Sequence, residues 1–213
     1  MLIQKKSNGA YMRGKKLNKS HVVKLIVFAV IFALLGSVYV YRVKKVNEML
    51  PKTETISYKV GDTIDFGEDI MINYPMTGYS IRVNDSNVLT YEAFIKKYNA
   101  KDEYTFVPDK IYEVNVTLNN EDAEDDIGIS LYEFYLQKNG ALSSVDTNML
   151  SIANPKLDGV ADIALVKNSS FDITLTFGLY DYQFDKHTWE NLEDYGLNLV
   201  VTLYPTKKVV SLM

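Results

Sequence analysis

The sequence of 213 residues contains no cysteine, only two histidines and a single tryptophan. Without cysteine the chain cannot form disulfides, thiolate metal sites, a cysteine nucleophile or a lipid anchor on an N-terminal cysteine. His21 lies in a basic N-terminal segment, so His187 is the one imidazole in the remainder, and no G-x-S-x-G motif supplies a nucleophile for it. We therefore predict a non-catalytic protein that needs no cofactor.

Charge divides the chain into two unlike parts. Residues 1–50 carry ten basic side chains and one acidic, whereas residues 51–213 carry thirteen basic and twenty-six acidic, which gives net charges of +9 and -13. An acidic part of this size repels nucleic acid and anionic lipid, so we expect no nucleic-acid partner.

The boundary between these parts follows a long apolar run. Residues 25–41 are seventeen consecutive uncharged residues, LIVFAVIFALLGSVYVY, and residues 22–41 would form a helix of about 30 Å, enough to cross a bilayer. All seven charges before the run are positive, which favours a cytoplasmic N-terminus and an extracytoplasmic C-terminal part. A cleaved signal peptide is the alternative. The length of the run, the lack of an A-x-A-like site and interfacial Tyr39 and Tyr41 favour a retained anchor.

These features predict four regions in the chain. Residues 1–21 are a basic cytoplasmic tail, residues 22–41 a transmembrane helix, residues 42–54 a juxtamembrane stalk and residues 55–213 an extracytoplasmic domain. Pro51 is expected to end any helix that continues out of the membrane.

The domain shows mostly two-residue periodicity, which indicates β-strands. In residues 111–120 Tyr112, Val114, Val116 and Leu118 alternate with polar residues, which predicts a strand with one solvated face. Similar patterns predict about nine strands in all. The segments are 55–60, 64–73, 79–84, 111–120, 127–137, 161–166, 170–182, 197–204 and 207–212.

Two short helices are expected among the strands. Tyr91, Phe94, Ile95 and Tyr98 have the spacing of one helix face, and residues 186–192 favour a second helical turn. Many short strands without regular strand–helix alternation predict an antiparallel β-sandwich of immunoglobulin-like type, preceded by the transmembrane helix.

Three segments carry a resemblance to a known family: YKVGDTIDFGEDIMI, SFDITLTFGLY and LNLVVTLYPTKKVVSLM. The domain resembles the telokin-like, immunoglobulin-like domains of uncharacterised membrane-anchored surface proteins of Gram-positive bacteria. The resemblance implies a sandwich fold and a location on the bacterial cell surface, and it assigns no residue a function.

The densest polar segment is residues 119–126. Its carboxylates Asp122, Glu124 and Asp126 are the candidate calcium ligands, because Ca²⁺ prefers oxygen donors. Their spacing does not match the EF-hand loop, since Ile127 stands where that loop has glycine. We therefore favour a solvated hairpin loop and predict no metal site.

Residues 179–189 hold the strongest candidate contact surface. Four aromatic side chains fall in this connection, and loops that present aromatic rings are common binding elements. The candidate binding residues are Tyr180, Tyr182, Phe184 and Trp189.

The sequence therefore favours a membrane-tethered binding or accessory module of the cell envelope, with an envelope or extracellular protein or a glycan as partner. A hydrolase of envelope polymers that uses acidic residues, and a single-span subunit of an envelope assembly, remain alternatives.

Overall fold

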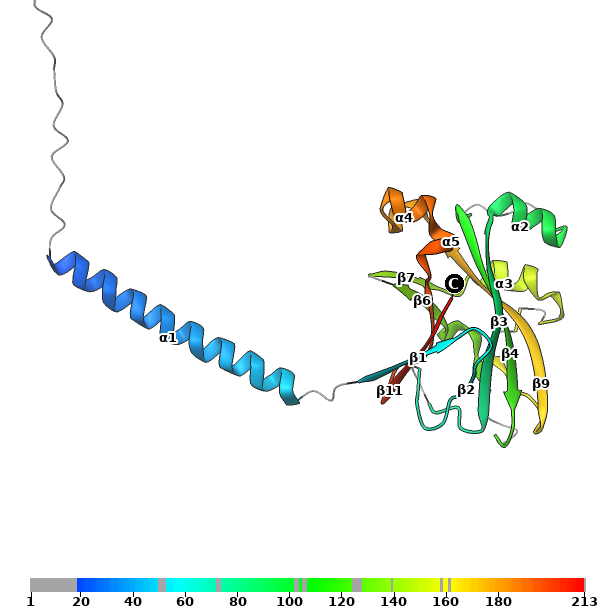
Figure 1. The fold of residues 1–213 in the computed structure, drawn as a ribbon, viewed down its shortest axis with the longest axis horizontal. Helices are drawn as coiled ribbons and strands as arrows, with labels where there is room; N and C mark the ends of the chain where they lie inside the picture. Colours follow the sequence, from blue (N-terminus) through cyan, green and yellow to red (C-terminus); the bar gives the residue numbers. More distant parts are fainter. Residues whose placement is uncertain are drawn as a thin grey trace, which may run out of the picture. The chain divides into compact units, whose positions relative to one another are not determined.

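The chain divides into two units, Met1–Lys52 and Thr53–Met213 (Figure 1). The computed structural model describes residues 19–49, 53–71, 74–101, 104, 107–123, 128–138, 140–157, 159–160 and 162–212. The first unit contains helix α1 (Lys19–Met49), and the second contains all the strands described below.

Helix α1 is the only described helix that is long and apolar enough to cross a membrane, judged by length and composition. It extends past the apolar run and ends at Met49, two residues before Pro51. Proline lacks a backbone donor and disfavours helix in the residue before it, so the end of α1 follows from the sequence.

The second unit is mainly β and contains two large sheets. The five-stranded sheet has the order β1 (Glu54–Lys59), β11 (Thr206–Ser211), β10 (Asn198–Thr202), β6 (Tyr135–Lys138) and β7 (Ala141–Ser144). The four-stranded sheet has the order β2 (Thr63–Asp65), β3 (Tyr79–Thr90), β4 (Lys110–Asn120) and β9 (Ser169–Leu179). A small third sheet pairs β5 (Ile129–Ser130) with β8 (Asp162–Ile163).

Short helices connect the strands. The α-helices are α2 (Tyr91–Tyr98), α3 (Thr147–Ala153), α4 (Lys186–Glu190) and α5 (Leu192–Tyr195), and the 3-10 turns are η1 (Leu131–Glu133), η2 (Pro155–Leu157) and η3 (Asp181–Gln183). Helix α2 begins where the hydroxyl of Thr90 accepts a hydrogen bond from the Ala93 amide, and it ends at Asn99 in the left-handed conformation.

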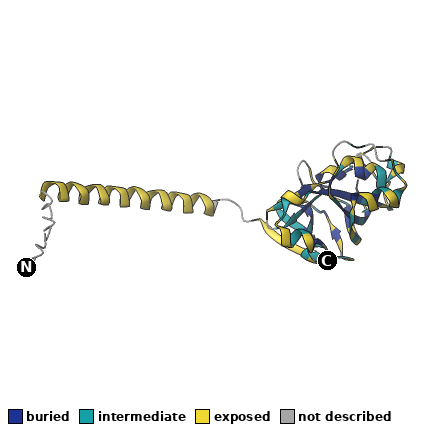
Figure 2. Ribbon diagram, turned by 90° about the horizontal axis from the view of Figure 1, so that it is seen from above, coloured by how far each residue is buried: buried dark blue, intermediate teal, exposed yellow. Residues whose placement is uncertain are grey.

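Both large sheets contribute side chains to one hydrophobic core. Ile81, Val116 and Leu175 from the four-stranded sheet join Leu199 and Val210 from the five-stranded sheet in a single buried cluster. Figure 2 shows the buried residues concentrated in the strands of this unit. Burial of this much apolar surface from two sheets is what stabilises the unit.

Several strands differ from the predicted ones. Strand β3 continues to Thr90 instead of ending near residue 84, with an irregular register between Val83 and Asp85. Residues 127–137 do not form one strand, because the turn η1 separates β5 from β6. The expectation of an all-antiparallel sandwich is wrong at one pair of strands, because β1 pairs with β11 in parallel. A parallel pair cannot be joined by a short hairpin, and β1 and β11 are the first and last strands of the domain.

The outer face of β4 is not solvated as the alternation predicts. Helices α2 and α3 cover part of it, and Tyr91, Phe94 and Met149 form a second buried cluster there with Ile111. Glu113, predicted to face solvent, is fully buried beneath α2. The alternation of a strand therefore predicts on which face of the sheet a polar residue lies, but not whether a helix covers that face.

Asp69 links the segment after β2 to the last strand. Its carboxylate accepts hydrogen bonds from the Lys208 ammonium at 2.8 Å and from the Thr206 amide at 2.8 Å. The same ammonium also donates to the Phe66 carbonyl oxygen at 3.1 Å. Burial alone would raise the pKa of Asp69, but these contacts outweigh it and hold that pKa below its usual value.

We expect Asp69→Asn to lower the free energy of unfolding at pH 7 by about 1–2 kcal/mol. Because the folded-state pKa is depressed, the carboxylate stabilises the fold above its unfolded pKa, and that contribution is lost as the pH falls through the folded pKa. The difference between wild type and variant should therefore shrink below about pH 4. Urea unfolding of the full chain in detergent micelles, followed by fluorescence of the single Trp189, measures it at each pH.

The matched control is Asp65→Asn, which removes an exposed carboxylate on the neighbouring strand. Equal losses in the two variants at every pH would show that Asp69 does not act through its contacts with Lys208 and Thr206.

Candidate functional site

The predicted aromatic segment forms the connection that follows β9. The turn η3 comes directly after the strand, where the Tyr180 amide donates to the side-chain oxygen of Gln183 at 2.9 Å. Asp185 then caps α4, since its carboxylate accepts from the Thr188 amide at 3.1 Å. The segment is thus a fixed scaffold of short turns that holds each ring in place.

Phe184 and Trp189 pack inward. Their rings stack with centroids 5.7 Å apart, and Tyr195 meets Phe184 edge-on at 6.4 Å. The Lys110 ammonium lies over the Trp189 ring, 4.5 Å from its centroid, and donates to the Trp189 carbonyl oxygen at 2.9 Å. Phe184 and Trp189 are half-buried and contact the main core, so a large part of their role is structural.

Tyr182 is the ring of this segment that faces solvent. It stacks on Tyr180 with centroids 5.5 Å apart and an interplanar angle of 23°, yet 79% of it stays exposed. An exposed aromatic ring held by a stacking partner loses little conformational entropy on contact with a ligand.

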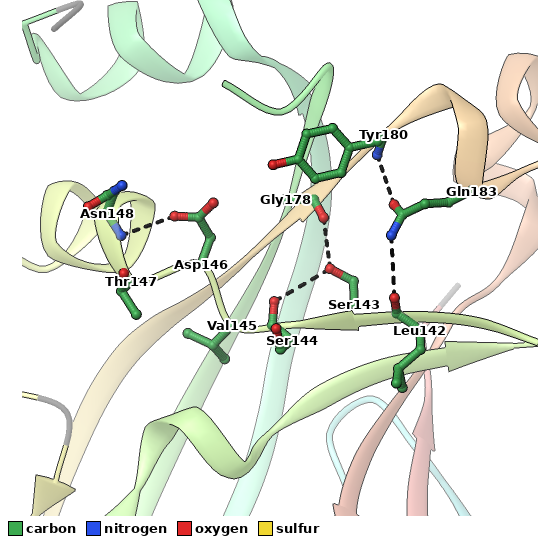
Figure 3. A pocket seen from close by; sticks show the side chains of 10 residues that line it. All are labelled: Leu142, Ser143, Ser144, Val145, Asp146, Thr147, Asn148, Gly178, Tyr180 and Gln183. Carbon is green, nitrogen blue, oxygen red and sulfur yellow. Dashed lines mark hydrogen bonds between the residues drawn. The ribbon is translucent and has the colours of Figure 1, made fainter. Parts of the chain in front are cut away.

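The Tyr180–Tyr182 pair lies between two pockets. One pocket of about 410 Å³ is bordered by Tyr180, and the other, of about 360 Å³, by Tyr182. The first is lined by Leu142, Ser143, Ser144, Val145, Asp146, Thr147, Asn148, Gly178, Tyr180 and Gln183 (Figure 3). The second is lined by Asp181, Tyr182, Phe184, Lys186 and Trp189. We call the first the Asp146 pocket and the second the Trp189 pocket.

The surroundings of Tyr180 are negative. Burial raises the pKa of the Tyr180 hydroxyl, and the charges of Asp146, Tyr182 and Asp109 raise it further. Asp109 is held close by, because one of its carboxylate oxygens accepts from the Asp181 amide at 3.0 Å. No basic side chain is among the described residues that line the Asp146 pocket.

A third pocket, on the outer face of the four-stranded sheet, has a different character. Its volume is also about 410 Å³. Its polar side chains bond to one another and to the strand backbone: Thr174 donates to Asn115 at 2.7 Å, and Asn154 bonds to both backbone groups of Thr174 at 2.8 and 3.0 Å. The polar groups of this third pocket thus use much of their hydrogen-bonding capacity on one another and on the backbone. Fewer of them are available to a ligand than in the Asp146 pocket.

The calcium candidates and His187 do not come together as a site among the described residues. Asp122 is exposed and pairs with Lys167, while Glu124 and Asp126 lie outside the described residues. Within the described part of the chain, no three His, Asp or Glu side chains are grouped to hold a metal ion. His187 is exposed on α4, and no nucleophile is recorded bonding to its ring among the described residues.

One wall of the Asp146 pocket was missed by sequence reasoning. Strand β7 and helix α3, which supply residues 142–148, were not predicted. On the β9 side, Tyr180 was predicted as a binding residue, and Gly178 is a further signal in the sequence, because a glycine inside a strand marks a place of close approach. A Cβ at Gly178 would lie 3.1 Å from Pro108 and 3.2 Å from the Asp146 carboxylate.

Comparison with known proteins gives one family. The profile described as Domain of unknown function (DUF5028) matches residues 55–208, which is most of the chain. No curated protein and no solved structure matches the sequence.

Proposed function

We propose that this chain, which belongs to the DUF5028 family, is a membrane-tethered, non-catalytic binding module whose contact surface is the Tyr180–Tyr182 end of the domain. The observation that carries the proposal is the exposure of Tyr182 on its stacked partner, between two pockets. Rigid, exposed aromatic rings are frequent centres of binding energy.

The tether in this proposal is α1. Its apolar run and the seven preceding positive charges favour an N-terminus in the cytoplasm and the domain outside, anchored by residues 22–41. Protease added to intact cells or protoplasts should then digest the part beyond residue 52. Protection of that part would reverse the orientation, and a mature chain that begins near residue 38 would make the run a signal peptide.

We also propose that the two sheets form an immunoglobulin-like sandwich, as expected for a bacterial surface domain. The single hydrophobic core, to which both sheets contribute side chains, supports a sandwich. The parallel β1–β11 pair and the helices over β4 are additions to that arrangement. An experimental structure in which the two sheets do not face each other would contradict this assignment.

Tyr182→Ala should weaken capture of the partner by about 30-fold, because an exposed ring at the centre of a contact typically contributes about 2 kcal/mol. Stability should be nearly unchanged, since most of the ring contacts solvent. The full chain in lipid nanodiscs serves as bait in envelope extract, and the captured envelope or extracellular component is titrated against wild type and variant.

Tyr132→Ala is the matched control, because Tyr132 is also an exposed tyrosine of a 3-10 turn but lies outside both pockets. If the control weakens capture as much as Tyr182→Ala does, or if neither variant affects it, the contact surface lies elsewhere.

A further inference from the structure

We propose that the Asp146 pocket binds a primary ammonium group, the side chain of a lysine in an extracytoplasmic polypeptide. This deepens the proposed function and rests on it, since the pocket shares the Tyr180–Tyr182 wall. Three properties of the pocket lead to this ligand: one uncommitted carboxylate oxygen, an aromatic hydroxyl that faces it, and the absence of basic side chains among the described lining residues.

The two oxygens of the Asp146 carboxylate differ in their hydrogen bonds. Its Oδ1 accepts hydrogen bonds from the amides of Asn148 and Met149, both at 3.0 Å, and so begins helix α3. Among the described residues none donates a hydrogen bond to Oδ2, which lies beside Gly178 at the edge of the pocket. One half of the carboxylate is therefore structural, and the other half is available to a ligand.

This division selects the kind of cation. A guanidinium group binds a carboxylate best through two parallel hydrogen bonds to both oxygens, and Oδ1 is already occupied. An ammonium group is a compact charge that needs only one oxygen from each partner. The geometry of Asp146 thus favours lysine over arginine.

Tyr180 supplies the second contact. Figure 3 shows its hydroxyl directed across the pocket toward the Asp146 side chain, so a donor placed between the two would meet two acceptors. The ring itself can attract a cation over its accessible area. The carboxylates of Asp146 and Asp109, whose charges help to raise the pKa of Tyr180, would also stabilise an ammonium group there.

The lack of a side chain at Gly178 lets the Asp146 carboxylate approach β9 closely at the edge of the pocket. A side chain at this position would come within 3.2 Å of Oδ2. The neighbouring Trp189 pocket and exposed Tyr182 lie next along the surface, where the residues adjoining the lysine in an extended polypeptide would contact them. The net charge of -13 over residues 51–213 favours approach of a basic polypeptide.

The test uses the full chain in nanodiscs of neutral lipid and three pentapeptides, acetyl-Gly-Gly-X-Gly-Gly-amide, with X as lysine, arginine or Nε-acetyl-lysine. Binding is measured by NMR line broadening at physiological salt. We expect the lysine peptide to bind at least about tenfold tighter than either of the others, because only it matches a single charged acceptor.

Asp146→Asn is the decisive variant. Asparagine keeps Oδ1 to cap α3 and replaces Oδ2 by a donor, so the melting temperature should hold while lysine-peptide affinity falls at least about tenfold. Tyr180→Phe should lower it about threefold. The control Asp162→Asn removes an equal charge from β8, which does not line the pocket, and should leave affinity unchanged.

The outcomes separate the two proposals. Equal binding of lysine and arginine peptides, or equal losses in Asp146→Asn and Asp162→Asn, would overturn the ammonium site in favour of unspecific attraction to an acidic domain. A glucosamine hexamer that binds tenfold tighter than the lysine peptide would overturn the polypeptide as source of the amine. If no peptide binds while partner capture still depends on Tyr182, the ammonium site is wrong and the binding module stands.

Discussion

Replacing Lys97 by methionine should lower the free energy of unfolding by about 3 kcal/mol, far more than expected for a half-exposed lysine on a short helix. Its ammonium donates to a Glu113 oxygen at 2.7 Å, and the Tyr98 hydroxyl donates to the other at 2.8 Å. Burial would lower the pKa of Lys97, but the Glu113 carboxylate outweighs it and raises that pKa.

The two partners of this ion pair are not equivalent. The Glu113 side chain is 1% exposed, whereas that of Lys97 is 45% exposed. Loss of Lys97 therefore leaves a buried carboxylate with one neutral partner, which is the costly way to break such a pair. Methionine keeps most of the apolar stem of lysine and lacks its ammonium group, so the change mainly removes the charge.

Lys96→Met is the control, because Lys96 is the neighbouring lysine on α2 and is exposed. Its cost should stay below about 0.5 kcal/mol. Glu113→Gln combined with Lys97→Met should recover most of the loss, since no buried charge then remains. Urea unfolding followed by Trp189 fluorescence gives all four values, and equal stability of the two single variants would refute the role of the pair.

Gly78→Ala is expected to cost about 3–5 kcal/mol, through backbone strain and overlap together. Gly78 precedes β3 with φ of +87°, and a Cβ there would lie 2.3 Å from the Ala123 nitrogen and 2.7 Å from the Asp122 carbonyl carbon. The turn cannot easily retreat, because Asn120 is buried and bonds to the Ala123 amide at 2.7 Å and to the Leu165 carbonyl oxygen at 2.7 Å.

Gly61→Ala separates the two contributions. Gly61 has φ of +94° but no atom within 4 Å of the position of a Cβ, so it should show the conformational cost alone, about 1–2 kcal/mol. Melting of the two variants is compared with wild type by the same fluorescence signal. Equal costs would mean that the turn at Ala123 moves aside freely.

Local patterns predict the elements that single segments determine. The apolar run of α1, the helix-face spacing of α2 and the alternation in β4 and β9 each carry their own signal. Helix α3 has only seven residues and no long periodic face, and β7 has four, so neither is distinguishable from a loop by pattern.

The candidate site also has a part that the sequence predicts and a part that only tertiary contacts create. The rings of residues 180–189 are adjacent in sequence and therefore visible there, but which ring points outward depends on contacts with Lys110 and Tyr195 from other elements. The Asp146 pocket arises where β7 and α3 meet the end of β9, through contacts between residues 30 and 35 positions apart in the chain. The prediction that Glu113 faces solvent was wrong for the same reason, because the packing of α2, which a strand pattern does not show, buries this part of the outer face of β4.

The most direct measurement of the central claim is photo-crosslinking in cells that express the full chain with p-benzoylphenylalanine at position 182 or at position 132. We expect a discrete crosslinked partner from position 182 and none from position 132, because exposed Tyr182 lines the Trp189 pocket and stacks on Tyr180 of the Asp146 pocket, whereas Tyr132 lines neither. Crosslinking to the same partner from position 132, with none from position 182, would contradict a binding surface at the Tyr180–Tyr182 end.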